Sequence, residues 1–214
     1  MGLTLNNNSL TLASSGGGST SSGLTTAEVN TLIQAQSEYE YITTVSQPTN
    51  VTEWLITTGI DHTKYSRHKY VITHGQLYAN GYWSWHLLQA DGTTRWNNGG
   101  SWYSRHAASG STSQSNITNT SILYFDGQSR TGSWSFNAEI EVIDEKTQNS
   151  GSGDHCINVF TRTGMGRTGG YWNGVTDGHA FFKKPDANTF HGGISIRQDV
   201  KELTCHIFGM RRRT

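Results

Sequence analysis

The sequence has little cysteine and little proline, with two of each among 214 residues. Two cysteines are too few for a disulfide framework, and the spacing of Cys156 and Cys205 is not that of a metal-binding motif. Cys205 alternates with Leu203 and Ile207, so we interpret it as a small side chain of the core. Aromatic residues nevertheless make up 11% of the chain, which is far too many for a disordered protein. Most of the chain is therefore expected to fold.

The sequence also lacks an excess of charge of either sign, because its 16 basic residues balance its 16 acidic residues. Its basic run is at 211–213, whereas a nucleic-acid-binding domain presents a basic face. No apolar run approaches the ~18 residues that a membrane-spanning helix needs. Residues 1–6 have neither the positive start nor the apolar stretch of a signal peptide. We therefore expect neither nucleic acid nor a membrane as partner, and synthesis in a cytoplasm without secretion.

Residues 1–23 combine an alternating apolar pattern with a flexible linker rich in glycine and serine. One interpretation of the alternating part is a disordered start of the chain. The other, which we favour, is a short strand-forming peptide that anchors the protein to a larger assembly. The alternating residues are Leu3, Leu5, Leu10 and Leu12.

Residues 24–37 are predicted to form a short helix, which begins with a T-x-x-E capping box at 25–28 and a hydrophobic staple around it. An isolated helix of this length is only marginally stable in water, so another surface must cover its apolar stripe. The stripe either packs on the chain's own β domain or joins identical helices of sister chains. We favour the second arrangement. The residues expected to make these contacts are Leu24, Val29, Leu32 and Ile33.

Residues 38–214 are predicted to form one β domain, because short alternating segments are divided by Gly, Asn, Asp and Ser without a helical pattern between them. The clearest alternation is at 134–143. The pattern predicts a mainly-β fold, namely an antiparallel β-sandwich of jelly-roll type preceded by the short helix and the extended N-terminal peptide. The predicted strands are 39–45, 51–57, 69–74, 82–90, 121–125, 134–143, 155–162, 179–183, 193–197 and 203–208.

Motifs for catalysis or metal binding are weak. Residues 164–169 have the form GxGxxG, but residues 170–174 cannot begin the helix that a dinucleotide site needs, so we interpret the motif as a glycine-rich strand connection. The nine histidines contain no local metal-binding pair and are interpreted as scattered surface and half-buried residues. The clustered acids are interpreted as a solvated sheet face and are Glu139, Glu141, Asp144 and Glu145. We therefore predict no catalytic residues, no cofactor and no metal site.

The best positive signal for function comes from aromatic residues in segments rich in Gly, Asn and Ser. Such rings can stack on the apolar faces of sugars while polar neighbours bind the hydroxyl groups. Alternatively, they wedge loops onto the sandwich or fill an interface between subunits. The candidate glycan-binding residues are Trp96, Trp102, Tyr103, Tyr171 and Trp172.

Both ends of the β domain resemble a known family. The segment at 37–45 is rich in tyrosine, and 204–211 ends on an apolar, aromatic, Gly, aliphatic, basic series in which Phe208 and Met210 hold the aromatic and aliphatic places. The segment at 23–33 is similar to the short trimerising helix of phage fibres. The chain thus resembles the C-terminal β-sandwich domains of tailed-bacteriophage fibre and virion structural proteins.

This resemblance implies a non-enzymatic virion protein, either a tail or head fibre or a capsid decoration protein, that is made in the host cytoplasm. It further implies a homotrimer that is held to other virion proteins by its N-terminal segment and displays the sandwich towards host-surface carbohydrate. The alternative is a carbohydrate-binding module or lectin of cellular origin. That alternative leaves residues 1–33 without a role.

If the predicted helix trimerises the chain, light scattering on the full-length protein should give the mass of a trimer. A chain that starts near Ser37 should give the mass of a monomer, because it lacks the apolar stripe. A monomeric full-length protein would contradict the prediction.

Overall fold

The computed structural model describes residues 2–6, 9–13, 38–77, 84–96, 100–108, 111–120, 122–125, 134–144, 155–167, 173–186 and 188–212. The chain divides into two compact units, Met1–Glu40 and Tyr41–Thr214. In the first unit, β1 (Gly2–Asn6) and β2 (Ser9–Ala13) pair as an antiparallel hairpin. Its register places Leu3 opposite Leu12 and Leu5 opposite Leu10. The leucine alternation therefore predicted strands correctly, while the helix expected at 24–37 lies outside the described residues.

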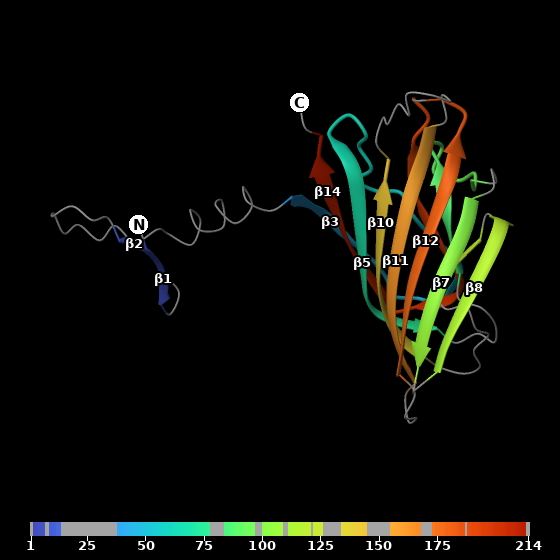
Figure 1. Ribbon diagram of the computed structural model, residues 1–214, viewed down its shortest axis with the longest axis horizontal. Coiled ribbons are helices and arrows are strands. Elements are labelled where there is room, and N and C mark those ends of the chain that lie inside the picture. The colour runs from blue at the N-terminus through green and yellow to red at the C-terminus, as the bar shows by residue number, and fades with distance from the viewer. Residues whose placement is uncertain are drawn as a thin grey trace. The chain divides into compact units, whose positions relative to one another are not determined.

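The second unit is built from antiparallel strands (Figure 1). Each of the ten predicted strands overlaps an observed one, and the strand at 134–143 has the predicted bounds. The structure thus confirms a mainly-β, antiparallel fold. In chain order the strands are β3 (Tyr39–Gln47), β4 (Val51–Ile56), β5 (Tyr65–Leu77), β6 (Ser84–Gln89), β7 (Gly100–Ala108), β8 (Ser111–Thr120), β9 (Leu123–Tyr124), β10 (Trp134–Ile143), β11 (His155–Arg167), β12 (Asn173–Lys184), β13 (His191–Lys201) and β14 (Leu203–Arg211).

The described strands form two layers, which give the unit a β-sandwich-like architecture. One layer has the order β3, β14, β5, β10, β11, β12, β7, β8, and the other contains β4, β13, β6 and β9. The first part of β5 pairs with β14, and its last residues pair with β13, where Leu77 lies opposite Val200. β5 therefore passes from one layer towards the other, as strands do at the corners of packed sheets.

The core lies between the layers and follows the alternation of the sequence. In β10, Ala138, Ile140 and Val142 are buried, whereas the residues between them face outward. In β14 the buried phase includes Cys205, as predicted, and burial raises the pKa of its thiol to about 12. Trp85 of β6 is fully buried in the same hydrophobic cluster. Side-chain direction in a strand has period two, so the spacing of apolar residues fixes which face joins the core.

Two strands were not predicted. β7 and β8 are rich in Ser, Thr and Asn and carry little apolar alternation. They join the sheet through their backbones, β7 along β12 and β8 along β7. The GxGxxG segment also differs from its prediction, because Gly164 and Gly166 lie within β11 and not in a connection. Within the described residues, no helix has the length and hydropathy that crossing a bilayer requires.

Glycine is needed where β13 lies close to its neighbours. Gly193 has a φ of 130°, and a Cβ atom there would lie 2.2 Å from the carbonyl oxygen of Ile56 in β4. At Gly192 a Cβ would lie 1.9 Å from the carbonyl oxygen of Gln89. By contrast, a Cβ on Gly164 would meet no atom within 4 Å. The backbone of β13 thus excludes side chains at two consecutive positions, while β11 has free space at Gly164.

These environments predict opposite effects of the same substitution. Gly193→Ala should lower the free energy of unfolding by roughly 2–4 kcal/mol, because the methyl group meets a backbone carbonyl and the left-handed φ is strained. Gly164→Ala is the matched control and should change stability by no more than about 1 kcal/mol. Urea unfolding of both variants measures the difference, and equal stabilities would contradict the close approach of β13 to β4.

Candidate functional site

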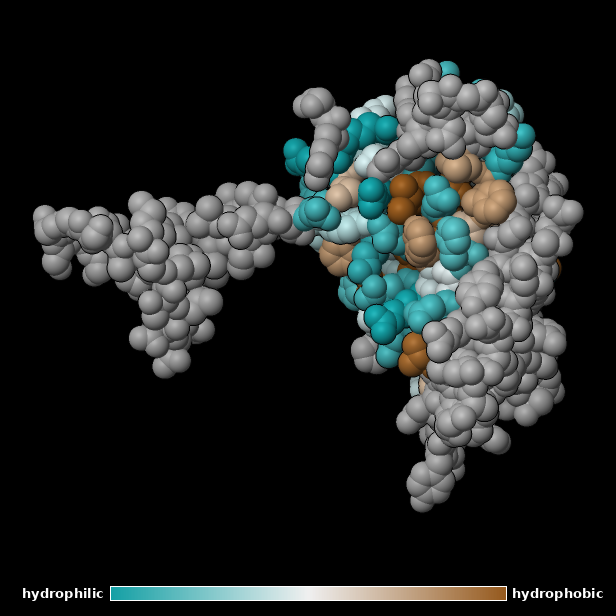
Figure 2. Space-filling view, viewed as in Figure 1, coloured by the Kyte–Doolittle hydropathy of each residue, from teal (hydrophilic) through white to brown (hydrophobic). Residues whose placement is uncertain are grey.

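The outward face of the larger layer exposes apolar side chains in a group. Phe160 of β11 and Val175 and Phe181 of β12 keep 44%, 43% and 42% of their surface exposed. Most large apolar residues of the described chain are instead buried between the layers. Figure 2 shows such apolar patches set among hydrophilic side chains on one face of the molecule. An exposed apolar group with a polar surround is typical of a binding surface.

The sheet register places Phe160 in one row across neighbouring strands. Phe160 lies opposite His179 of β12 and opposite Glu141 of β10, and Glu141 lies opposite Lys69 of β5. The rings of Phe160 and His179 are stacked, with centroids 4.7 Å apart and planes inclined by 19°. Stacking holds the phenyl ring in one orientation although much of it remains exposed.

Ion pairs surround the aromatic row and leave it without an excess of charge. Lys69 Nζ lies 2.8 Å from Glu139 Oε2, and Arg162 Nε lies 3.7 Å from Asp177 Oδ1. A third pair joins β5 and β10, with Arg67 Nη1 3.7 Å from Glu141 Oε1. Pairs as exposed as these contribute little to stability, so their groups remain available to a ligand.

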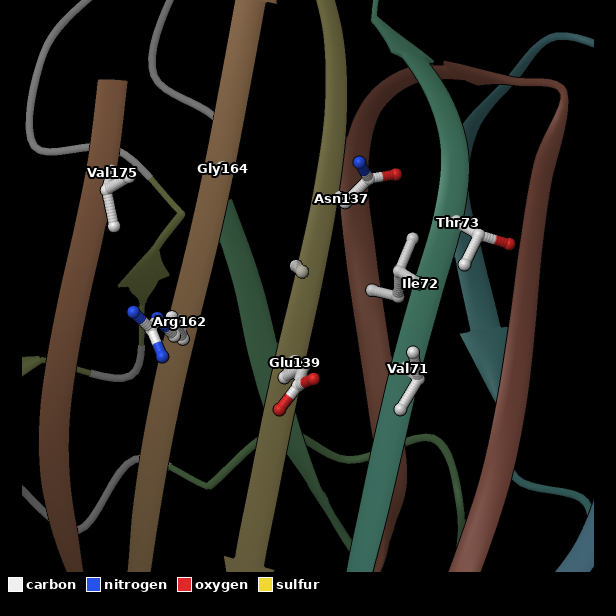
Figure 3. Close-up of a pocket in the computed structure, with 9 residues that line it drawn as sticks. Val71, Ile72, Thr73, Asn137, Glu139, Arg162, Gly164 and Val175 are labelled. Atoms are coloured by element: carbon white, nitrogen blue, oxygen red, sulfur yellow. The ribbon is translucent and has the colours of Figure 1, made fainter. Parts of the chain in front are cut away.

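Two adjoining hollows indent this face, with volumes of about 300 and 240 Å³. Glu139 and Arg162 line both of them, so the two form one trough across β5, β10, β11 and β12. Gly164 and Val175 line the larger hollow (Figure 3), and Phe160 lines the smaller one. The larger hollow exists because Gly164 occupies an outward position without a side chain. This trough is the candidate binding site.

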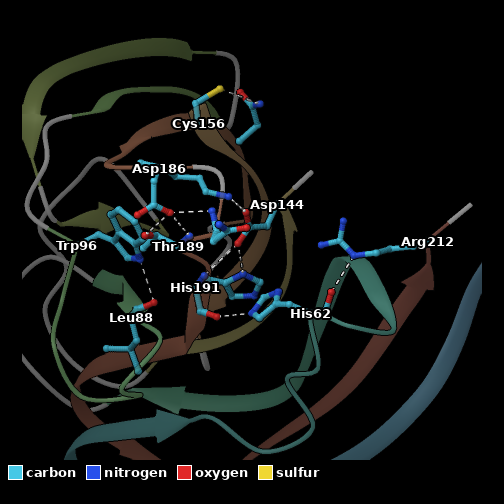
Figure 4. Close-up of polar contacts among 12 residues, drawn as sticks. His62, Leu88, Trp96, Asp144, Cys156, Asp186, Thr189, His191 and Arg212 are labelled. Atoms are coloured by element: carbon cyan, nitrogen blue, oxygen red, sulfur yellow. Dashed lines mark hydrogen bonds and ion pairs between the residues drawn. The ribbon is translucent and has the colours of Figure 1, made fainter. Parts of the chain in front are cut away.

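A second polar feature is buried at one end of the sandwich. Lys184 Nζ donates to Asp144 Oδ1 at 2.7 Å, and both side chains are fully buried. The other oxygen, Oδ2, accepts the backbone N–H of His191 at 3.0 Å and its ring Nδ1–H at 3.2 Å (Figure 4). Burial would raise the pKa of Asp144, but its contacts with His191 and Lys184 lower that pKa to about 2. The carboxylate is therefore ionised inside the protein.

The prediction that Asp144 belongs to a solvated sheet face is wrong, although it holds for the exposed Glu139. Asp144 follows β10 and continues the inward phase of Ile140 and Val142 beyond the strand end. An acid that follows such a strand in the inward phase was the signal for its burial. Glu145 lies outside the described residues.

The histidines are likewise not all scattered. His62 in the β4–β5 connection, His68 on β5 and His191 at the start of β13 bring one ring nitrogen each within 4.8 Å of the others. His68 and His191 are fully buried, and His62 is partly buried. The ring centroids lie 4.6–5.2 Å apart, with planes inclined by 72–76°. No two of these residues are close in sequence except His62 and His68, so local motifs could not reveal the cluster.

The structure places the predicted glycan-binding aromatics in different environments. Trp96 is only 2% exposed, and its indole N–H donates to the carbonyl of Leu88 at 3.0 Å (Figure 4). Its ring fills the core and cannot stack on a ligand, so the wedge interpretation is the correct one at this position. Trp102 and Tyr103 lie within β7 and not in a loop. Tyr103 is paired with His179, which extends the backbone register of the aromatic row, whereas Trp102 is paired with the buried Ala180.

The other predicted residues cannot be placed in this way. Tyr171 and Trp172 lie outside the described residues, as do the four helix residues Leu24, Val29, Leu32 and Ile33. Phe160 and Val175 were missed as site residues, because alternation with buried neighbours shows that a position faces outward but not that it contributes to a binding surface.

No protein-family model, no curated protein and no solved structure matches the chain.

The buried ion pair should be far more important for stability than an exposed one. Asp144→Asn should lower the free energy of unfolding by roughly 3–5 kcal/mol, because it leaves Lys184 as a buried charge without a partner. Lys69→Met, which removes the exposed pair with Glu139, should cost less than about 1 kcal/mol.

Adding Lys184→Met to Asp144→Asn should restore part of the lost stability, since the unpaired charge is then gone. Urea unfolding of the three variants measures these differences. Similar losses for Asp144→Asn and Lys69→Met would contradict the burial of the pair.

Proposed function

We propose that the protein is a non-enzymatic bacteriophage virion structural protein that binds carbohydrate through the trough on its larger sheet layer. The observation that carries the carbohydrate part is the exposed, stacked ring of Phe160 beside a hollow that Glu139 and Arg162 also line. A sugar ring presents an apolar face and an equatorial set of hydroxyl groups, and this combination of side chains is complementary to both.

The chemistry of each component fits this ligand. The free face of an aromatic ring accepts the C–H face of a pyranose, much as aromatic side chains bury apolar surface at protein interfaces. Carboxylate and guanidinium groups accept and donate hydrogen bonds to hydroxyl groups, and Arg162 offers several donors in a fixed geometry. The trough crosses four strands, so it can take more than one sugar unit.

The charge of the trough favours an uncharged polysaccharide over a polyanion. Its basic residues are each paired with an acidic residue of a neighbouring strand. A site for a nucleic acid or a strongly acidic polymer would instead present unpaired basic residues.

The virion part of the proposal is supported by the resemblance of the two ends of the β domain and by the leucine hairpin of β1 and β2. In this proposal the hairpin attaches the chain to other virion proteins, the segment at 24–37 forms a trimerising helix, and the sandwich is of jelly-roll type. A cellular carbohydrate-binding module or lectin is the second candidate. It would use the same trough but have no need of a trimer, so the oligomeric state separates the two.

Phe160→Ala should weaken binding to a responsive polysaccharide on an array of bacterial surface glycans by about 10–100-fold, the usual effect of losing a central aromatic contact. Because the ring is 44% exposed, the same change should lower stability by no more than about 1 kcal/mol. Gly164→Leu should also abolish binding, since it fills the larger hollow from a position with free space around it.

Leu55→Ala is the matched control, because Leu55 is 43% exposed on β4, in the other layer. It should leave glycan binding unchanged. The proposal fails if the Phe160 and Gly164 variants bind as tightly as the unchanged protein, or if their binding falls only in proportion to lost folding.

A further inference from the structure

We propose that His62, His68 and His191 bind one divalent transition-metal ion of the zinc class and that this ion joins the two layers of the sandwich at one end. The proposal is independent of carbohydrate binding, since none of these residues lines the trough. It is carried by the geometry of the three rings and by the hydrogen bonds that their nitrogens make or lack.

The three rings converge from separate parts of the fold. Three ligand atoms within 4.8 Å of one another lie no more than about 2.8 Å from a common centre, against the ~2.0–2.1 Å of a Zn–N bond. Shifts of less than about 1 Å would bring all three nitrogens to bonding distance. The mutually steep ring planes fit three imidazoles that surround one point, whereas rings packed against each other as hydrophobic groups would not need to aim their nitrogens together.

Hydrogen bonds engage one ring nitrogen of His62 and one of His191 and leave the other nitrogen of each ring unpaired. His62 Nε2 donates to the backbone carbonyl of His191 at 2.5 Å, and His62 Nδ1 has no partner. His191 Nδ1 donates to Asp144, and His191 Nε2 has no partner. Histidines that bind metals commonly donate their second N–H to a carbonyl or a carboxylate in this way.

Four ring nitrogens of the cluster have no hydrogen-bond partner. His62 Nδ1, His191 Nε2 and both ring nitrogens of His68 are buried and unpaired. Buried polar atoms without a hydrogen-bond partner are costly, and a bound metal ion would remove this cost at one nitrogen of each ring.

The donor set determines the kind of metal. Its ligands are nitrogen atoms, which suit zinc, copper, nickel and cobalt, whereas calcium and magnesium prefer oxygen ligands. Asp144 does not add an oxygen ligand, because its two oxygens already bind Lys184 and His191. Three nitrogens leave a fourth tetrahedral position for water or hydroxide, and the partial exposure of His62 provides a route for the ion.

The test uses the full-length protein without an affinity tag, stripped of metal with a chelator. Calorimetric titration with zinc chloride should show one ion bound per chain, and cobalt chloride should give the visible spectrum of a tetrahedral site. Zinc should raise the melting temperature, and a chelator should reverse the increase.

His68→Gln and His62→Gln should each weaken zinc binding by more than the about 10–100-fold expected for Asp144→Asn, which replaces the carboxylate that accepts the His191 Nδ1–H. His206→Gln is the matched control. His206 lies on β14 and contacts Thr44, away from the cluster, so its loss should leave the affinity unchanged. His62 is partly buried, so its variant remains informative if His68→Gln does not fold.

Three results would overturn the proposal. One is the absence of zinc and cobalt binding by the folded protein, and another is binding that survives both histidine substitutions. The third is a high-resolution structure, determined from crystals grown with zinc, in which a water molecule and not a metal ion bridges the three rings.

Discussion

One buried carboxylate organises the end of the sandwich. Asp144 follows β10, Lys184 ends β12 and His191 begins β13, so the contacts of a single side chain connect three strand ends from both layers. Inside the protein each charged group depends on the others, because water cannot replace a lost partner. The position of His191 follows from this contact, and the orientation of His62 follows from the carbonyl of His191. The arrangement of the three imidazoles is therefore a consequence of where Asp144 lies.

The same end of the molecule shows what alternation in a sequence can and cannot predict. Period-two spacing located the strands with apolar faces, and it identified Cys205 as part of the core. Asp144 also continues the inward phase of this spacing, whereas the general preference of acids for water predicts the opposite. His68 has the same phase as Tyr70 and Ile72, and Lys184 the same phase as Phe182. Polar residues in the inward phase at strand ends thus contained the signal for a buried cluster, whereas their partners came from distant segments.

The outward face of the larger layer could not be predicted from apolar alternation. β7 and β8 have no apolar stripe, so their pairing depends on the free edge of β12 and could not be predicted from their own residues. The trough needs a small residue beside large ones, and Gly164 supplies it in a segment that was predicted to be a glycine-rich strand connection. Trp96 was predicted to bind a ligand because its neighbours along the chain are polar, but the fold buries its ring. Local composition describes the neighbours of a residue along the chain, and the site is made by neighbours across strands.

The pairing of β5 has a consequence for how the chain folds. β5 begins at Tyr65, yet its neighbours are β10 and β14, and β14 also holds β3 in the sheet. β3 therefore lacks its partner, and β5 lacks one of its partners, until the segment at 203–211 has left the ribosome. Such long-range pairing makes folding slow and leaves early strands exposed in the meantime. The domain should consequently reach its native state only after β14 has been synthesised, and shortening the chain within β14 should prevent folding of the layer as a whole.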